Sequence, residues 1–232
     1  MVQPPRCRRR EMLLSLLATA AGLSACQQGS RSSQPSEAVP GADSQFAGKT
    51  LLINGAGATF PGPLYLRWFS DYRQVDPRVE INSQPVGSAT GIRQFIDQTV
   101  DFAASDVAMS DAEIAEVKWG VVMIPMTAGS IAVGYHLPGI RSGLKLSRSV
   151  LVQIFRGQIT QWRDPQILAL NPDWEIPDLP ITVCYRFDGS GTTDTFTRHL
   201  AAIDPAWAAE IGVGMSLEWP VGIGVHERPD AL

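Results

Sequence analysis

Three short turns hold the side chains whose types and spacing could do chemistry. Each turn is rich in glycine or alanine, follows an apolar run and precedes a helical pattern; they carry Thr59, Ser88 and the Ser190-Gly191-Thr192 group. The first turn of a helix leaves about four backbone N–H groups without partners and carries roughly half a positive charge. Glycine lets a ligand approach the backbone closely. The pattern therefore predicts a binding site for a small anion.

Each of these hydroxyl residues also has a purely structural explanation. Ser and Thr are common helix N-caps, so one such turn alone says little about a ligand. Three such turns in one chain favour the anion site. Arg186 stands just before the third turn, and its guanidinium offers a planar fork of donors that suits tetrahedral oxyanions. An isolated arginine could equally be a surface residue.

The elements that must position these turns alternate between strands and helices. Pro61 and Pro63 suit a first helical turn, and Ser110 with Glu113 forms a capping-box pattern. The alternation predicts an α/β fold with a largely parallel sheet, in which ligands bind beyond the carboxyl ends of the strands. Strands are expected at residues 50–54, 79–86, 102–105 and 181–186, β-rich runs at 119–127 and 130–137, turns at 55–60, 87–91 and 188–192, and helical patterns at 61–69, 92–96, 110–113, 149–155 and 196–203.

Four motifs in this order resemble a known family. They are GAGATFP at residues 55–61, GS at 87–88, VDFAASD at 100–106 and RFDGSGT at 186–192. Together they are similar to the phosphate-binding protein of the bacterial phosphate-specific ABC transporter, and the likeness runs from about residue 50 to Gly224. The resemblance implies an α/β fold of the two-lobed periplasmic-binding-protein type (type II), with lobe 1 in residues 49–126 and lobe 2 in residues 127–232.

The resemblance also implies a ligand set, position by position. Phe60 is implied to donate through its backbone, and Asp188 to hold the arginine. The implied phosphate-binding residues are Thr59, Phe60, Ser88, Asp106, Arg186, Ser190, Gly191 and Thr192.

Asp106, implied to be the hydrogen-bond acceptor, has a clear physical role. Phosphate near neutral pH still carries at least one proton, whereas sulfate carries none. A carboxylate could accept a hydrogen bond from phosphate but would meet only lone pairs and a like charge on sulfate. Because hydrogen bonds to charged groups are worth about 1.5–3 kcal/mol, strong discrimination between the two anions is expected.

The resemblance implies a binding protein that delivers inorganic phosphate to the membrane-spanning and ATP-binding subunits of an ABC importer, with no cofactor. A binder of another oxyanion (sulfate, molybdate or phosphonate) is one alternative. An enzyme is another, but Ser190 lies in Asp-Gly-Ser-Gly, which is not the G-x-S-x-G nucleophile elbow. His199 is nine residues further along the same expected helix, too far along its axis to serve Ser190 as a base.

The N-terminal residues have the pattern of a lipoprotein leader. Residues 1–25 combine an arginine-rich start with a short apolar stretch, and Leu23-Ser24-Ala25-Cys26 resembles the bacterial lipobox. Cys26 is then the expected lipidation site, and residues 26–48, rich in Ser, Gln, Pro and Gly, a flexible tether. The chain is therefore expected to be exported and lipid-anchored at the bacterial cell membrane, facing the periplasm or the cell exterior. An ordinary signal peptide and twin-arginine export are the alternatives.

Charge and chain length limit the remaining possibilities. Removing residues 1–25 takes away four arginines and one glutamate, so the net charge falls from −4 to −7, which argues against nucleic acid as a partner. His136, His199 and His226 lack metal-ligand spacing, and no CxxC pair occurs. The resemblance stops after Gly224, so the fold is expected to be incomplete at its C-terminus and of low stability, and an inactive remnant is a further alternative.

Overall fold

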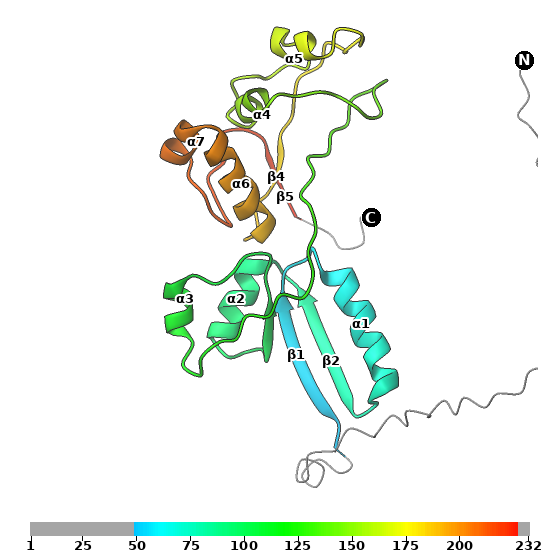
Figure 1. Ribbon diagram of the computed structural model, residues 1–232, viewed down its shortest axis with the longest axis vertical. Coiled ribbons are helices and arrows are strands. Elements are labelled where there is room, and N and C mark those ends of the chain that lie inside the picture. The colour runs from blue at the N-terminus through cyan, green and yellow to red at the C-terminus, as the bar shows by residue number, and fades with distance from the viewer. Residues whose placement is uncertain (1–48, 227–232) are drawn as a thin grey trace, which may run out of the picture. The chain divides into compact units, whose positions relative to one another are not determined.

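The computed structural model describes residues 49–226, which all belong to one compact unit. The expected signal peptide, the expected lipidation site Cys26 and the whole of the expected tether lie outside the described residues, as do residues 227–232. None of the described helices is both long enough and apolar enough to span a bilayer. The elements labelled in Figure 1 are, in order, β1 (Leu51–Gly57), α1 (Gly62–Val75), β2 (Val79–Pro85), α2 (Ser88–Ile96), β3 (Phe102–Ala104), α3 (Asp111–Glu116), α4 (Arg148–Phe155), α5 (Pro165–Leu170), β4 (Cys184–Arg186), α6 (Gly191–Ile203), α7 (Pro205–Glu210) and β5 (Ile223–Val225).

The first sheet has the order β2-β1-β3, and all its pairings are parallel. Helix α1 packs against β2, and α2 packs against β1 and β3 (Figure 1). A second, two-stranded sheet pairs β4 with β5, again in parallel. The predicted α/β class with parallel strands is therefore confirmed, and the carboxyl ends of β1, β2 and β3 lie at one edge of their sheet.

Strand β1 extends three residues further than its apolar run predicts. Residues 55–57 were expected to be part of a turn, but they lie in the strand, where Gly55 and Gly57 pair with Phe102 and Ala104 of β3. A Cβ on Gly55 would lie 2.1 Å from the Phe102 ring, and one on Gly57 would lie 1.9 Å from the Ala104 carbonyl oxygen. These glycines permit close strand packing and do not mark the turn.

Helix starts follow the local sequence closely. Helix α1 begins after Pro61 with a proline in its first turn, and α3 has the predicted capping box between Ser110 and Glu113. The second predicted turn is shorter than expected, because α2 already begins at Ser88.

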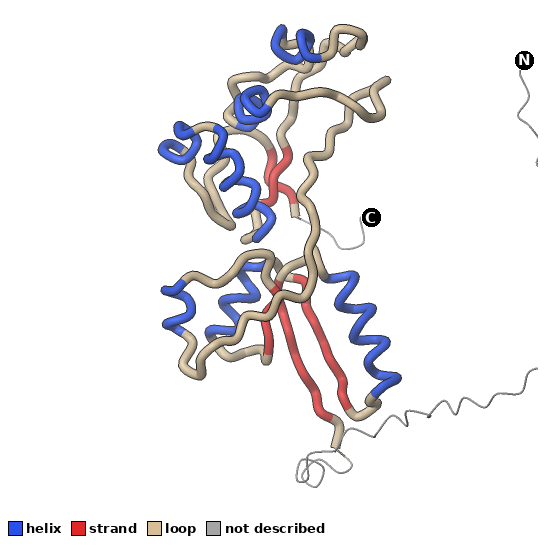
Figure 2. The backbone as a smooth tube through the Cα atoms, viewed as in Figure 1, coloured by secondary structure: helices blue, strands red, loops and turns tan. Residues whose placement is uncertain are grey.

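The prediction of β structure in residues 119–127 and 130–137 is wrong. Apart from an isolated bridge between Leu137 and Ile140, the structure gives these residues no strand pairing, and Figure 2 draws them as loop. Most of their side chains remain exposed, as at Trp119 (80%) and Val122 (83%), although Leu137 is buried at 3%. A strand needs a neighbour to complete its hydrogen bonds, and no strand in residues 49–226 pairs with this stretch.

Most of the buried apolar side chains belong to the second half of the described chain. One cluster is built around residues such as Val150, Ile167 and Ile176, and another around Val152, Leu200 and Trp207. By contrast, α1 has no buried residue, and its apolar side chains Leu64 and Trp68 remain exposed. The boundary between two lobes at residues 126 and 127, and the expectation of low stability, stay predictions.

Candidate functional site

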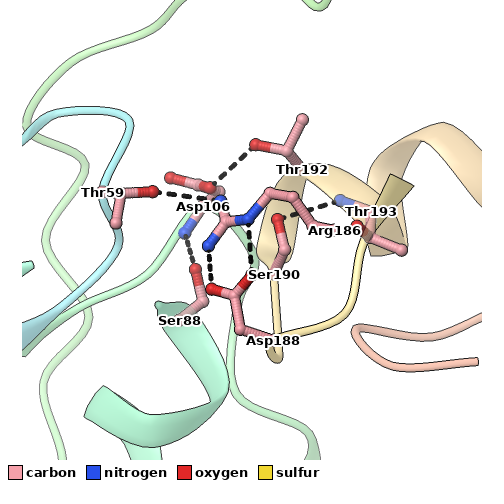
Figure 3. Close-up of polar contacts among 8 residues, drawn as sticks. All are labelled: Thr59, Ser88, Asp106, Arg186, Asp188, Ser190, Thr192 and Thr193. Atoms are coloured by element: carbon pink, nitrogen blue, oxygen red, sulfur yellow. Dashed lines mark hydrogen bonds and ion pairs between the residues drawn. The ribbon is translucent and has the colours of Figure 1, made fainter. Parts of the chain in front are cut away.

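The three turns and Asp106 converge on one cluster of polar side chains (Figure 3). Thr59 follows β1, Ser88 opens α2 after β2, Asp106 follows β3, and the third turn joins β4 to α6. Thr59, Ser88 and Ser190 are buried, at 5%, 1% and 0% exposure. The parallel arrangement of β1, β2 and β3 brings Thr59, Ser88 and Asp106 to one edge of the first sheet. The third turn reaches the same cluster from the second sheet.

Arg186 connects the third turn to the first. Its Nη1 donates to the Thr59 hydroxyl oxygen over 3.0 Å, and its Nε donates to Asp188 Oδ1 over 2.9 Å. Its Nη2 also pairs with the Asp188 carboxylate, and both side chains are nearly buried. Burial acts to raise the pKa of the Asp188 carboxyl, but the hydrogen bonds and charge of Arg186 outweigh it, so the pKa lies below the ordinary aspartate value.

Asp106 connects the second turn to the third. Its backbone N–H donates to the Ser88 hydroxyl oxygen over 3.3 Å, and its Oδ2 accepts from the Thr192 hydroxyl over 3.2 Å. The pKa of the Tyr65 phenol in α1 lies above its ordinary value. Burial of the side chain is the larger cause, and the negative charge of the Asp106 carboxylate is the second. One carboxylate therefore stands among groups that are mostly donors.

The capping contacts distinguish the hydroxyl of Ser190 from those of Thr59 and Ser88. The Ser190 oxygen accepts from the Thr193 N–H over 3.3 Å, so Ser190 is the N-cap of α6. Helices α1 and α2 have no side-chain cap hydrogen bond. The structural explanation therefore holds for Ser190, while the hydroxyls of Thr59 and Ser88 do not serve as caps.

Glycines bring the second and third turns into backbone contact. The Ala89 N–H donates to the Gly189 carbonyl oxygen over 3.1 Å, and Gly87 has a positive φ of 90°. A Cβ on Gly191 would lie 2.7 Å from Ser88 Oγ and 2.8 Å from Asp106 Cβ. The sequence analysis did not predict that Gly87, Ala89 and Gly189 bring the two turns together. The presence of a glycine in both turns was the signal that could have indicated this close approach.

Phe60 differs from the other predicted residues. Its ring is 47% exposed, and a Cβ on Gly129 would lie 2.2 Å from it, so the ring packs over the segment that follows the first sheet. Its backbone lies between Thr59 and Pro61, the N-cap of α1.

The cluster combines a guanidinium, hydroxyl groups and helix N-termini with the carboxylates of Asp106 and Asp188. This combination suits a small anion that still carries a proton. Within residues 49–226, no group of three or more His, Cys, Asp or Glu side chains could hold a metal ion.

Sequence comparison places the chain in a family. Residues 20–229 match the family model described as the PBP superfamily domain. The chain belongs to the PBP superfamily. Its helices and parallel strands form the fold expected of a PBP-superfamily chain.

Several curated relatives of this PBP-superfamily chain are named phosphate-binding protein PstS. The Haemophilus influenzae protein is 42% identical over 173 residues, which cover 74% of this chain and 51% of that protein. A Xylella fastidiosa protein is 37% identical over 177 residues, covering 76% and 48%. The chain thus spans about half the length of the curated relatives it matches.

Two solved structures of phosphate-transport proteins show some likeness to this chain. An ABC-type phosphate transport receptor from Vibrio cholerae aligns with a TM-score of 0.43 and 20% identity, covering 76% of this chain and 64% of that one. A putative phosphate ABC transporter substrate-binding protein with bound phosphate, from Clostridium perfringens, aligns with a TM-score of 0.46 and 20% identity, covering 63% and 55%.

Proposed function

We propose that this chain binds inorganic phosphate non-covalently and takes part in its delivery to an ABC importer. The observation that carries the proposal is the position of Asp106, whose carboxylate accepts from the Thr192 hydroxyl and whose backbone N–H donates to the Ser88 hydroxyl oxygen. An anion that still carries a proton can accept hydrogen bonds from such donors and give its own proton to the Asp106 carboxylate. The names of the relatives support the same ligand.

The proposed ligand residues combine several kinds of donor with one acceptor. Arg186 supplies the positive charge, and Asp188 orients it. The starts of α1, α2 and α6 supply backbone N–H groups. The proposed set is Thr59, Phe60, Ser88, Asp106, Arg186, Ser190, Gly191 and Thr192, with Asp188 behind the arginine.

We propose binding and not catalysis as the role of the cluster. Ser190 is occupied as an N-cap, and His199 stands nine residues later on the same helix, about 13 Å further along the axis at 1.5 Å per residue. A serine nucleophile needs a base within hydrogen-bond reach.

The proposed location is outside the cytoplasmic membrane, with Cys26 as the lipid attachment point and the importer's membrane-spanning and ATP-binding subunits as partners. The leader pattern and the relatives' names support this proposal. Labelling with a radioactive fatty acid, compared between the unaltered chain and Cys26→Ser, tests the anchor; label on both would contradict it.

Calorimetric titration of the purified chain with phosphate, sulfate, molybdate and methylphosphonate tests the ligand. We expect phosphate to bind and sulfate to bind at least about a hundredfold more weakly, about 2.7 kcal/mol. Equal affinity for sulfate would contradict the role of Asp106. A folded chain, judged by circular dichroism, that bound none of the four anions would support the inactive-remnant alternative instead.

A further inference from the structure

Gly91 lies in α2 at the point where this helix meets β1. It follows Ser88 by three residues on the same helix, and both residues are buried. Residues three apart lie on one face of an α-helix. The face of α2 that carries Ser88 to the candidate anion site is therefore also the face that packs on β1.

The contact between α2 and β1 at this point is made by backbone atoms. A Cβ on Gly91 would lie 2.4 Å from Gly57 Cα and 2.7 Å from the Ala56 carbonyl oxygen. Non-bonded carbon atoms normally stay about 3.5–4.0 Å apart, so a methyl group there would force the helix to retreat by roughly 1 Å. Both contacted atoms belong to the backbone of a buried strand end, so no change of rotamer could relieve the clash.

Gly57 also connects this contact to the neighbouring elements. Its carbonyl oxygen accepts from the N–H groups of residues 86 and 87, both over 2.9 Å, and these residues lead directly into Ser88. On its other side Gly57 pairs with Ala104 of β3, two residues before Asp106. The ends of β1 and β3 and the start of α2 are thus joined through backbone contacts. The spacing between Ser88 and Asp106 follows from this packing.

We propose that Gly91 is a positioning residue of the candidate anion site, because its lack of a side chain sets how closely Ser88 and the start of α2 approach Asp106. The Asp106 N–H donates to the Ser88 hydroxyl oxygen over 3.3 Å, which is near the long end of the range for such bonds. A retreat of α2 by roughly 1 Å would break this bond. The effect on phosphate rests on the proposed function, whereas the effect on the Asp106–Ser88 contact does not.

Calorimetric titration with phosphate compares Gly91→Ala with the unaltered chain. We expect the dissociation constant to rise about tenfold or more, because the Ser88 hydroxyl and the first N–H groups of α2 retreat from the anion. Gly134→Ala is the matched control, since a Cβ there would meet nothing within 4 Å. Val150→Ala shortens a buried side chain of a separate core cluster and should lower the free energy of unfolding without changing the dissociation constant. An unchanged affinity in Gly91→Ala, or an equal loss in either control, would overturn the proposal.

Amide hydrogen exchange at Asp106, followed by NMR without phosphate, tests the positioning separately from the proposed function. We expect exchange at this N–H to be faster in Gly91→Ala and unchanged in Gly134→Ala, because only the first variant moves the Ser88 acceptor away. Unchanged exchange in Gly91→Ala would contradict the proposal even if phosphate affinity fell. If the unaltered chain bound no phosphate but exchange at Asp106 responded as expected, the proposed function would fail and the positioning role of Gly91 would stand.

The unaltered chain offers a further check that does not depend on how well Gly91→Ala folds. The Hα protons of Gly57 and Gly91 should give a nuclear Overhauser cross-peak, because the two backbones meet there. Phosphate should leave this cross-peak in place, since the contact already exists without the anion. A missing cross-peak, or its loss when phosphate is added, would show that this packing does not set the site.

Discussion

The Thr192 hydroxyl donates to the Asp106 carboxylate over 3.2 Å, although 86 positions separate the two residues in the chain. This contact fixes the carboxylate relative to the start of α6, while its own backbone N–H is bound to Ser88 at the start of α2. The acceptor proposed for a protonated anion is therefore held from two sides.

Replacing Asp106 with asparagine should reduce the preference for phosphate over sulfate. The amide keeps the size of the side chain but removes the negative charge that repels an unprotonated anion. We expect the ratio of the two dissociation constants to fall about tenfold or more, about 1.4 kcal/mol, in calorimetric titrations. Asp71→Asn, in an exposed pair with Arg67, is the control. An unchanged ratio in Asp106→Asn would remove this residue from the specificity mechanism.

Arg186→Lys should weaken phosphate binding about tenfold or more, because one ammonium cannot hold both Asp188 and Thr59 in the arginine's geometry. Arg198→Lys is a matched control: Arg198 also pairs with an aspartate through Nε and Nη2, but its side chain is 69% exposed. Equal losses of affinity in the two variants would mean that Arg186 has no special role.

Gly191→Ala should lower phosphate affinity while leaving α6 formed. The added methyl group would lie 2.7 Å from Ser88 Oγ and 2.8 Å from Asp106 Cβ, so the two turns must move apart. Alanine is otherwise the better helix former. Gly214→Ala, whose nearest contact would be an ordinary 3.7 Å, serves as the control in the same titration. Affinity equal to that of the unaltered chain would show that the close packing of the turns is dispensable.

Substitutions at Ser190 should separate capping from binding. Ser190→Ala removes the N-cap of α6 and should lower the free energy of unfolding by about 1 kcal/mol, whereas Ser190→Gly should cost only a few tenths from the cap itself. Both variants lose the hydroxyl, so both should bind phosphate more weakly. Urea unfolding and calorimetry measure the two effects. A variant with full affinity would show that the hydroxyl serves only the helix.

The Arg186–Asp188 pair should make stability depend on pH in the acid range. The pKa of Asp188 is lower in the folded chain than its ordinary value, so the pair's contribution is fully present above the ordinary value and is lost as the pH falls through the folded one. We expect the unaltered chain to have a higher free energy of unfolding than the Asp188→Asn variant. This difference should be constant near neutral pH and should shrink below about pH 4. An advantage that grew on acidification would contradict this sign.

Local sequence was a good guide wherever an element is determined by its own residues. The capping box at Ser110, the helix after Pro61 and the parallel strands all follow the expected pattern. The three turns could be picked out in advance because each links an apolar run to a helical pattern, whereas Asp106 was included through the family resemblance.

The errors arise where distant residues decide the outcome. Gly55 and Gly57 continue a strand because Phe102 and Ala104 come close to them, which no local pattern reveals. Residues 119–137 have strand-like composition but no strand pairing among the described residues. Ser88 and Ser190 both stand in a turn before a helix, so the sequence does not distinguish them. Only the contacts show that Ser190 caps α6 and that Ser88 caps no helix.

Cys184 on β4 has a practical consequence. Its thiol is exposed and not in a disulfide, and Cys184 lines a cavity of about 850 Å³ together with Tyr185 and Arg186. In an oxidising solution or compartment, two copies that meet at this edge can be joined by an intermolecular disulfide. Such a covalent dimer would block access to this cavity, so preparations need a reductant. A thiol-reactive dye attached to Cys184 would report optically on whether a molecule enters the cavity.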